Sequence, residues 1–79
     1  MKNLTAILTG VRPGVDFSTS TDFVKDGFLD SLDVIRLVGE LDEAYSIAIP
    51  GEDIVSENFV SLQSIERLVE KHKRGGGGN

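Results

Sequence analysis

The sequence predicts an all-α fold, a four-helix bundle of three main helices and one short helix with a long first loop. Three segments repeat apolar residues with the helical period, and no two segments alternate as paired strands would. The alternating residues 47–49 are too few to build a sheet. A chain of 79 residues suffices for one small domain, which we place at residues 1–74. The Gly-rich residues 75–79 are predicted to be a disordered tail.

The first helix is predicted from a short apolar stripe that stops before Pro13-Gly14. Its members have the spacing of one helical face: Leu4, Ile7, Leu8 and Val11. The following residues 15–30 are rich in Ser, Thr, Asp and Gly. A connection this long is usually either functional or disordered. Phe23 and Phe28 favour a loop that is ordered by its aromatic side chains.

The strongest helix pattern covers residues 31–45 and precedes the breaker Pro50-Gly51. Residues 56–59 are predicted to form one helical turn. Ser61 is a good N-cap for a last helix, whose buried stripe is Leu62, Ile65, Leu68 and Val69. Basic residues at its end suit the helix dipole, and we expect His72 among them to be solvated.

Composition excludes several classes of function. The net charge of −5 argues against nucleic acid as a partner, because binding phosphates needs clustered Lys and Arg. With no cysteine and a single histidine, we expect no metal site and no catalytic residues. No apolar run is long enough to span a bilayer, so we expect no stable membrane insertion. A cytoplasmic monomer is the resulting expectation.

The helix at residues 31–45 carries more apolar surface than one core requires. Its broad apolar face consists of Val34, Leu37, Val38, Leu41, Ala44 and Tyr45. A polar strip lies elsewhere: Asp33, Arg36, Glu40 and Glu43. A second, narrow apolar stripe is formed by Leu32, Ile35 and Gly39. This stripe either packs under the loop or another helix, or it faces solvent and docks a partner, rimmed by Asp33, Asp42 and Glu43.

The stripe starts one residue after a serine at the junction of loop and helix, in Asp26-Gly27-Phe28-Leu29-Asp30-Ser31-Leu32. One interpretation is structural, because Asp30 and Ser31 are both favoured N-caps. The other is functional, and it depends on the context of this serine: the long loop before it, the helix after it, the acidic charge and the chain length.

The segment from Gly27 to Asp33, followed by Leu37, Leu41, Tyr45 and Ile47-Ala48-Ile49-Pro50, closely resembles acyl carrier proteins. The resemblance covers residues of about 4–73 and is strongest from Phe23 to Pro50. It implies the acyl-carrier-type four-helix bundle and a carrier without catalytic residues of its own. The serine that it implies for attachment of 4′-phosphopantetheine is Ser31, flanked by Gly27, Asp30 and Leu32. The arm comes from coenzyme A and holds acyl groups as thioesters.

The resemblance also implies two surfaces. The partner-docking residues would be Leu32, Asp33, Ile35, Arg36, Gly39, Asp42 and Glu43. A pocket for the acyl chain would be lined by Val34, Val38, Leu41 and Ile49, unless these residues only fill the core. The implied partners are a phosphopantetheinyl transferase, a ligase that loads an acyl or aminoacyl group, and a downstream transferase or synthase.

Two features depart from the carriers of fatty acid synthesis. Arg36 stands where those carriers usually have an acidic residue, and residues 51–62 look more like stand-alone carriers of the D-alanine ligase type. The pathway is therefore left open among fatty acid, lipid and specialised-metabolite biosynthesis. The alternative function is a non-carrier interaction module in which Ser31 only caps a helix.

Overall fold

The computed structural model describes the backbone of residues 3–77 and the side chains as far as residue 73. The main helices are α1 (Leu4–Val11), α2 (Ser31–Tyr45) and α3 (Leu62–Gly77). Three 3-10 turns join them: η1 (Phe17–Thr19), η2 (Gly51–Asp53) and η3 (Ser56–Phe59). The all-α prediction is confirmed, since no strand occurs within the described range. The predicted tail stays a prediction, and its residues 78–79 lie outside the described part.

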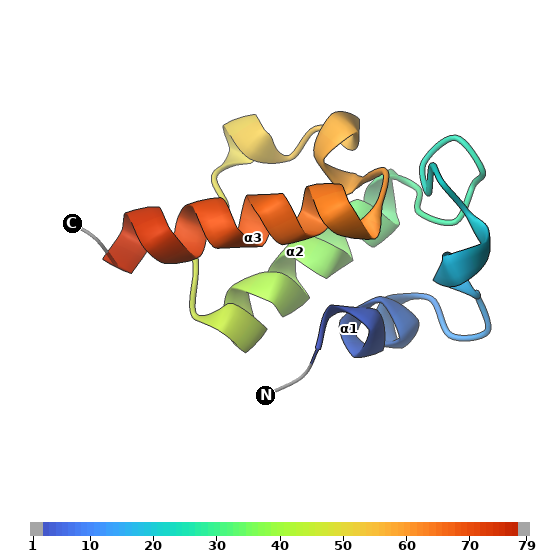
Figure 1. The fold of residues 1–79 in the computed structure, drawn as a ribbon, viewed down its shortest axis with the longest axis horizontal. Helices are drawn as coiled ribbons and strands as arrows, with labels where there is room; N and C mark the ends of the chain where they lie inside the picture. The colour runs from blue at the N-terminus through green and yellow to red at the C-terminus, as the bar shows by residue number, and fades with distance from the viewer. Residues whose placement is uncertain (1–2, 78–79) are drawn as a thin grey trace.

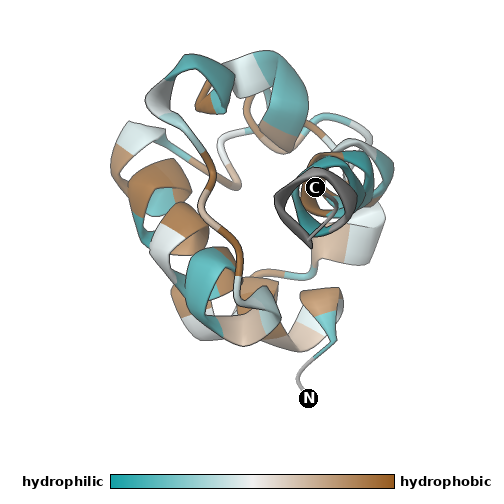
Figure 2. Cartoon of the chain, turned by 90° about the vertical axis from the view of Figure 1, so that its left-hand side faces the viewer, coloured by the Kyte–Doolittle hydropathy of each residue, from teal (hydrophilic) through white to brown (hydrophobic). Residues whose placement is uncertain are grey.

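The helices surround one apolar core. In Figure 1, α3 crosses in front of α2, α1 lies to one side of this pair, and η2 and η3 lie on the opposite side. Figure 2 shows that the helices carry both hydrophobic and hydrophilic residues, as amphipathic helices around a shared interior do. The most deeply buried large side chains come from every part of the bundle: Leu8, Phe23, Leu29, Leu37, Leu41, Phe59 and Ile65.

Local signals at the helix ends agree with the sequence. The Ser61 hydroxyl accepts a hydrogen bond from the Ser64 backbone N–H at 3.1 Å, and the Ser64 hydroxyl accepts one from the Ser61 N–H at 3.1 Å. This reciprocal pair caps α3 as predicted. Helix α2 ends at Tyr45, and the C-cap Ser46 adopts the left-handed conformation with φ 55°.

The long loop is ordered, as its aromatic residues predicted. Phe17 contacts Phe23 edge to face, with ring centroids 4.9 Å apart, and Phe28 at 5.9 Å. The Phe23 carbonyl accepts hydrogen bonds from the backbone N–H groups of Phe28 and Leu29 at 2.8 and 3.0 Å. The Phe23 N–H donates to the Val60 carbonyl at 2.7 Å, which ties the loop to the end of η3. The loop therefore fixes where α2 begins.

Candidate functional site

Ser31 is the first residue of α2, and its side chain is exposed. Asp30 precedes it with extended backbone and acts as the N-cap, because its Oδ1 accepts a hydrogen bond from the Asp33 N–H at 2.8 Å. In return, the Asp30 N–H donates to Asp33 Oδ2 at 3.1 Å, which completes a capping box. Within the described part of the chain, no hydrogen bond engages the Ser31 hydroxyl. The helix start is therefore satisfied by Asp30, and Ser31 is left available for chemistry.

The capping box is connected to α1 by an ion pair. Asp33 Oδ2 accepts a hydrogen bond from Arg12 Nη1 at 2.7 Å, and the Asp33 side chain is only 8% exposed. Burial raises the pKa of Asp33, but the hydrogen bond from the Asp30 backbone and the guanidinium of Arg12 outweigh it. The pKa of Asp33 therefore lies below its ordinary value, and the carboxylate stays ionised at neutral pH.

This ion pair predicts a loss of stability in acid. A carboxyl group whose pKa is lower in the folded state contributes stability above its unfolded pKa, and this contribution is lost as the pH falls through the folded pKa. Asp33→Asn should lower the free energy of unfolding at pH 7 by about 0.5–2 kcal/mol, the usual worth of a capping contact. As the pH falls below the ordinary pKa of an aspartate and through the lowered pKa of Asp33, the difference between wild type and variant should shrink. Urea unfolding over a pH series measures both effects.

Glu40→Gln is the matched control, because Glu40 lies exposed on the same helix. This variant should follow the wild-type pH profile throughout. A difference between Asp33→Asn and wild type that stays constant from neutral to acidic pH would contradict the proposed contribution of the carboxylate charge.

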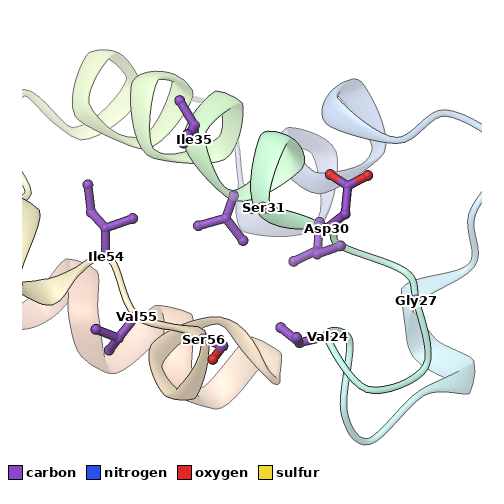
Figure 3. Close-up of a pocket in the computed structure, with 10 residues that line it drawn as sticks. Val24, Gly27, Asp30, Ser31, Ile35, Ile54, Val55 and Ser56 are labelled. Atoms are coloured by element: carbon purple, nitrogen blue, oxygen red, sulfur yellow. The ribbon is translucent and has the colours of Figure 1, made fainter.

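An apolar cavity of about 490 Å³ opens beside Ser31. It lies between the start of α2, the loop, and the segment that joins η2 to η3. Figure 3 shows the segment of Ile54, Val55 and Ser56 opposite the start of α2, with the Ile54 side chain extending towards α2, while the Asp30 carboxylate points away from the cavity. Most of the lining side chains are aliphatic: Val24, Leu29, Val34, Ile35, Ile54 and Val55.

Only one of the four predicted pocket residues lines this cavity, namely Val34. Val38, Leu41 and Ile49 are buried in the core and are not part of the lining. The sequence pattern missed the opposite wall at residues 54–56, because this segment has no helical or strand periodicity to mark a face.

The outer face of α2 presents the second apolar stripe to solvent. Leu32 is 59% exposed and Ile35 is 62% exposed, so the stripe does not pack under the loop. Arg36 and Gly39 are also exposed, and together with Ile35 they line a shallow groove against the end of α1. A Cβ at Gly39 would meet no atom within 4 Å, so packing inside the protein does not require this glycine.

Two predicted rim residues are placed differently. Asp33 was expected in a polar strip at the rim of the docking surface, but the structure buries it, because it caps α2 and pairs with Arg12. Asp42 is half-buried, and its Oδ1 accepts a hydrogen bond from the Ile49 N–H at 3.0 Å. Glu43 is exposed as expected. Of the three acidic residues predicted at the rim of the docking surface, only Glu43 is therefore exposed.

A polar cluster at the end of α3 was also missed. His72, expected to be solvated, has a side chain only 17% exposed, and its Nε2 lies 2.8 Å from Asp53 Oδ2. Lys71 Nζ lies 3.1 Å from the same oxygen. Asp53 is far in sequence from His72 and Lys71, so the sequence could not show that they meet. The only sequence feature that pointed to this cluster was the run of basic residues at the end of α3.

Across residues 3–77, no helix is long and apolar enough to cross a membrane. The same residues contain no group of three or more metal-ligating side chains that could hold an ion.

Comparison with known proteins gives a consistent result. The family model described as "Phosphopantetheine attachment site" matches residues 2–70. The acyl carrier protein of Brachyspira hyodysenteriae is 30% identical over 74 residues, covering 94% of this chain and 92% of the relative. The acyl carrier protein of Helicobacter pylori strain J99 is 38% identical over 52 residues, covering 66% and 64%. The search of solved structures produced no significant match.

Proposed function

Because the chain belongs to the acyl carrier protein family, we propose that Ser31 is the residue that bears its phosphopantetheine arm. The observation that carries the proposal is the exposed hydroxyl of Ser31, which no described residue engages, at the start of a helix that Asp30 already caps. The cavity beside this hydroxyl adds a second, independent reason.

The protein is a carrier, and its cofactor is a covalently attached 4′-phosphopantetheine. When bound, this group supplies a thiol that holds acyl groups as thioesters. The residues around Ser31 fit such a group. The phosphodiester would lie at the N-terminal end of α2, where the helix dipole favours negative charge. The alternative, an interaction module in which Ser31 is only a cap, is not favoured, because the cap is Asp30.

The direct test is incubation of the protein with coenzyme A and a phosphopantetheinyl transferase, followed by mass spectrometry of the fragments. We expect one phosphopantetheine group per chain, on the fragment that contains Ser31. A group found on another serine, such as Ser56 in the opposite wall of the cavity, would refute the assignment.

The cavity supports an aliphatic cargo. Its lining is mainly aliphatic, and its polar residues, Asp30, Ser31 and Ser56, lie at the start of α2 and of η3. An acyl chain would bury apolar surface there, whereas the ammonium of an aminoacyl group would gain little. Fatty or other aliphatic acyl transfer is therefore our preferred assignment, and a D-alanyl cargo is the second.

Acyl carrier proteins work with phosphopantetheinyl transferases and biosynthetic enzymes. We infer that the partners of this chain dock on the outer face of α2, defined here as Leu32, Ile35, Arg36 and Gly39. The face adjoins Ser31, so a transferase that acts on this serine must approach it. Its two exposed apolar side chains can be buried by a partner, and an acidic group on the partner would complement Arg36.

We also propose that a ligase loads the cargo onto this carrier and that a transferase or synthase receives it. We propose further that the carrier catalyses no reaction itself and that it is located in the cytoplasm.

Replacement of Ile35 tests this docking face. Ile35→Asp should raise the KM of the transferase for the carrier roughly ten-fold and leave kcat nearly unchanged, because an apolar anchor is lost from an interface. The stability should change little, since the side chain is largely exposed. Gln63→Asp, on the exposed side of α3, is the control and should behave as wild type. Equal KM values for the two variants would exclude docking through Ile35.

A further inference from the structure

The segment that joins η2 to η3 forms one wall of the cavity beside Ser31, through Ile54, Val55 and Ser56. Its backbone hydrogen bonds are local: the Ile54 N–H donates to the Gly51 carbonyl at 3.1 Å, and the Asn58 N–H donates to the Val55 carbonyl at 3.0 Å. Such bonds shape the segment but do not hold it against the rest of the bundle. Ile54 is half-buried and packs against the core, so the position of the wall depends on this contact and on what anchors its two ends.

The end of the wall at η3 is anchored by packing. Phe59 is completely buried in the core. The next residue, Val60, accepts the hydrogen bond from the Phe23 N–H at 2.7 Å. Neither contact involves Asp53 or Ile54, so this end should stay in place when the other end is released.

The end of the wall at η2 is anchored by a polar contact. Asp53 directly precedes Ile54, and its Oδ2 accepts hydrogen bonds from His72 Nε2 at 2.8 Å and from Lys71 Nζ at 3.1 Å. The Asp53 carbonyl also accepts one from Asn58 Nδ2 at 2.8 Å. The hydrogen bonds from His72 and Lys71 lower the pKa of Asp53, which keeps the carboxylate ionised.

The two α3 partners of Asp53 differ in exposure. The Lys71 side chain is 63% exposed, whereas those of His72 and Asp53 are 17% and 16% exposed. The contact with Lys71 contributes little, because solvent competes for the exposed ammonium and a long, mobile side chain must be ordered to keep the contact. His72 is therefore the partner that fixes Asp53, and with it the first residue of the wall.

We infer that Asp53 and His72 are a positioning pair that sets the place of Ile54 and Val55, and thereby how firmly the cavity holds the aliphatic part of the cargo. The inference rests on the proposed attachment at Ser31. On this inference, a residue at the end of α3, far from Ser31 in sequence, affects how strongly the cavity binds the acyl chain.

The test compares the holo protein with the same protein loaded with an octanoyl group. In wild type, octanoylation should raise the melting temperature, because a chain bound in the cavity stabilises the folded state. In His72→Ala this increment should fall by about half or more. A purely structural contribution of His72 would lower both melting temperatures equally and leave the increment unchanged, and this result would overturn the inference.

Two further variants sharpen the test. His72→Gln retains a side-chain N–H donor and should restore most of the increment. Lys71→Ala should keep the wild-type increment, because its contact with Asp53 is exposed. Equal losses in Lys71→Ala and His72→Ala would contradict the assignment to His72.

Hydrogen exchange separates this inference from the proposed function. The Ile54 amide should exchange roughly ten-fold faster in His72→Ala than in wild type, whether or not Ser31 carries a group. If Ser31 accepts no phosphopantetheine but the exchange rate rises, the attachment site is wrong and the anchoring of the wall is right. An unchanged Ile54 rate refutes the positioning pair.

Discussion

Ser31→Ala should accept no phosphopantetheine group when it is incubated with coenzyme A and a transferase. The loss should be complete, because the alanine has no oxygen on which the phosphodiester bond can form. Intact-mass measurement of the variant and the wild type under the same conditions gives the result directly.

The variant should also fold normally, and this distinguishes the attachment site from a structural serine. Asp30 and Asp33 cap α2 without the Ser31 hydroxyl, so the free energy of unfolding should change by no more than about 0.5 kcal/mol. Ser56→Ala, in the opposite wall of the cavity, is the control and should be modified at the wild-type rate. A mass increase that persists in Ser31→Ala would remove Ser31 from the proposed function.

Phe23→Ala should produce the largest loss of stability in the loop, about 3–5 kcal/mol. Phe23 is 1% exposed and packs edge to face against Phe17, and its removal leaves a cavity that the surrounding side chains cannot fill. Its backbone also positions Phe28 and Leu29 just before the start of α2. Urea unfolding, followed by circular dichroism, measures the loss.

Phe28→Ala is the matched control, since Phe28 lies at the edge of the core and is only half-buried. It should lose markedly less stability than Phe23→Ala. If the Phe23 variant lost less than about 1 kcal/mol, the loop would be held mainly by its hydrogen bonds and not by its aromatic packing.

The elements of this fold could be predicted because their signals are local. Apolar residues at helical spacing marked α1, α2 and α3, and a serine marked the start of α3. The same periodicity separated Leu32 and Ile35 from the core-facing residues, but it left open whether they pack under the loop or face solvent, and only the folded chain shows that they are exposed.

The site could be predicted only in part, because its other determinants join distant segments. The helical wheel placed Asp33 in a polar strip, but Arg12, the C-cap of α1, pairs with it and allows its burial. Asp53 and His72 likewise meet only in the folded chain. The cavity wall at residues 54–56 is irregular, so no period could show which side chains face Ser31.

The capping of α2 by Asp30 has a consequence for the life cycle of the protein. A carrier passes from an unmodified to a modified form, and each form must be competent to meet enzymes. If the attachment serine also closed the helix end, esterification would replace its hydroxyl and shift the folding equilibrium with every addition and removal of the arm. With the attachment at Ser31 that we propose, the two tasks fall on adjacent residues, because Asp30 is the N-cap. The hydrogen bonds of the capping box then do not depend on the arm, and the same helix start can serve both forms.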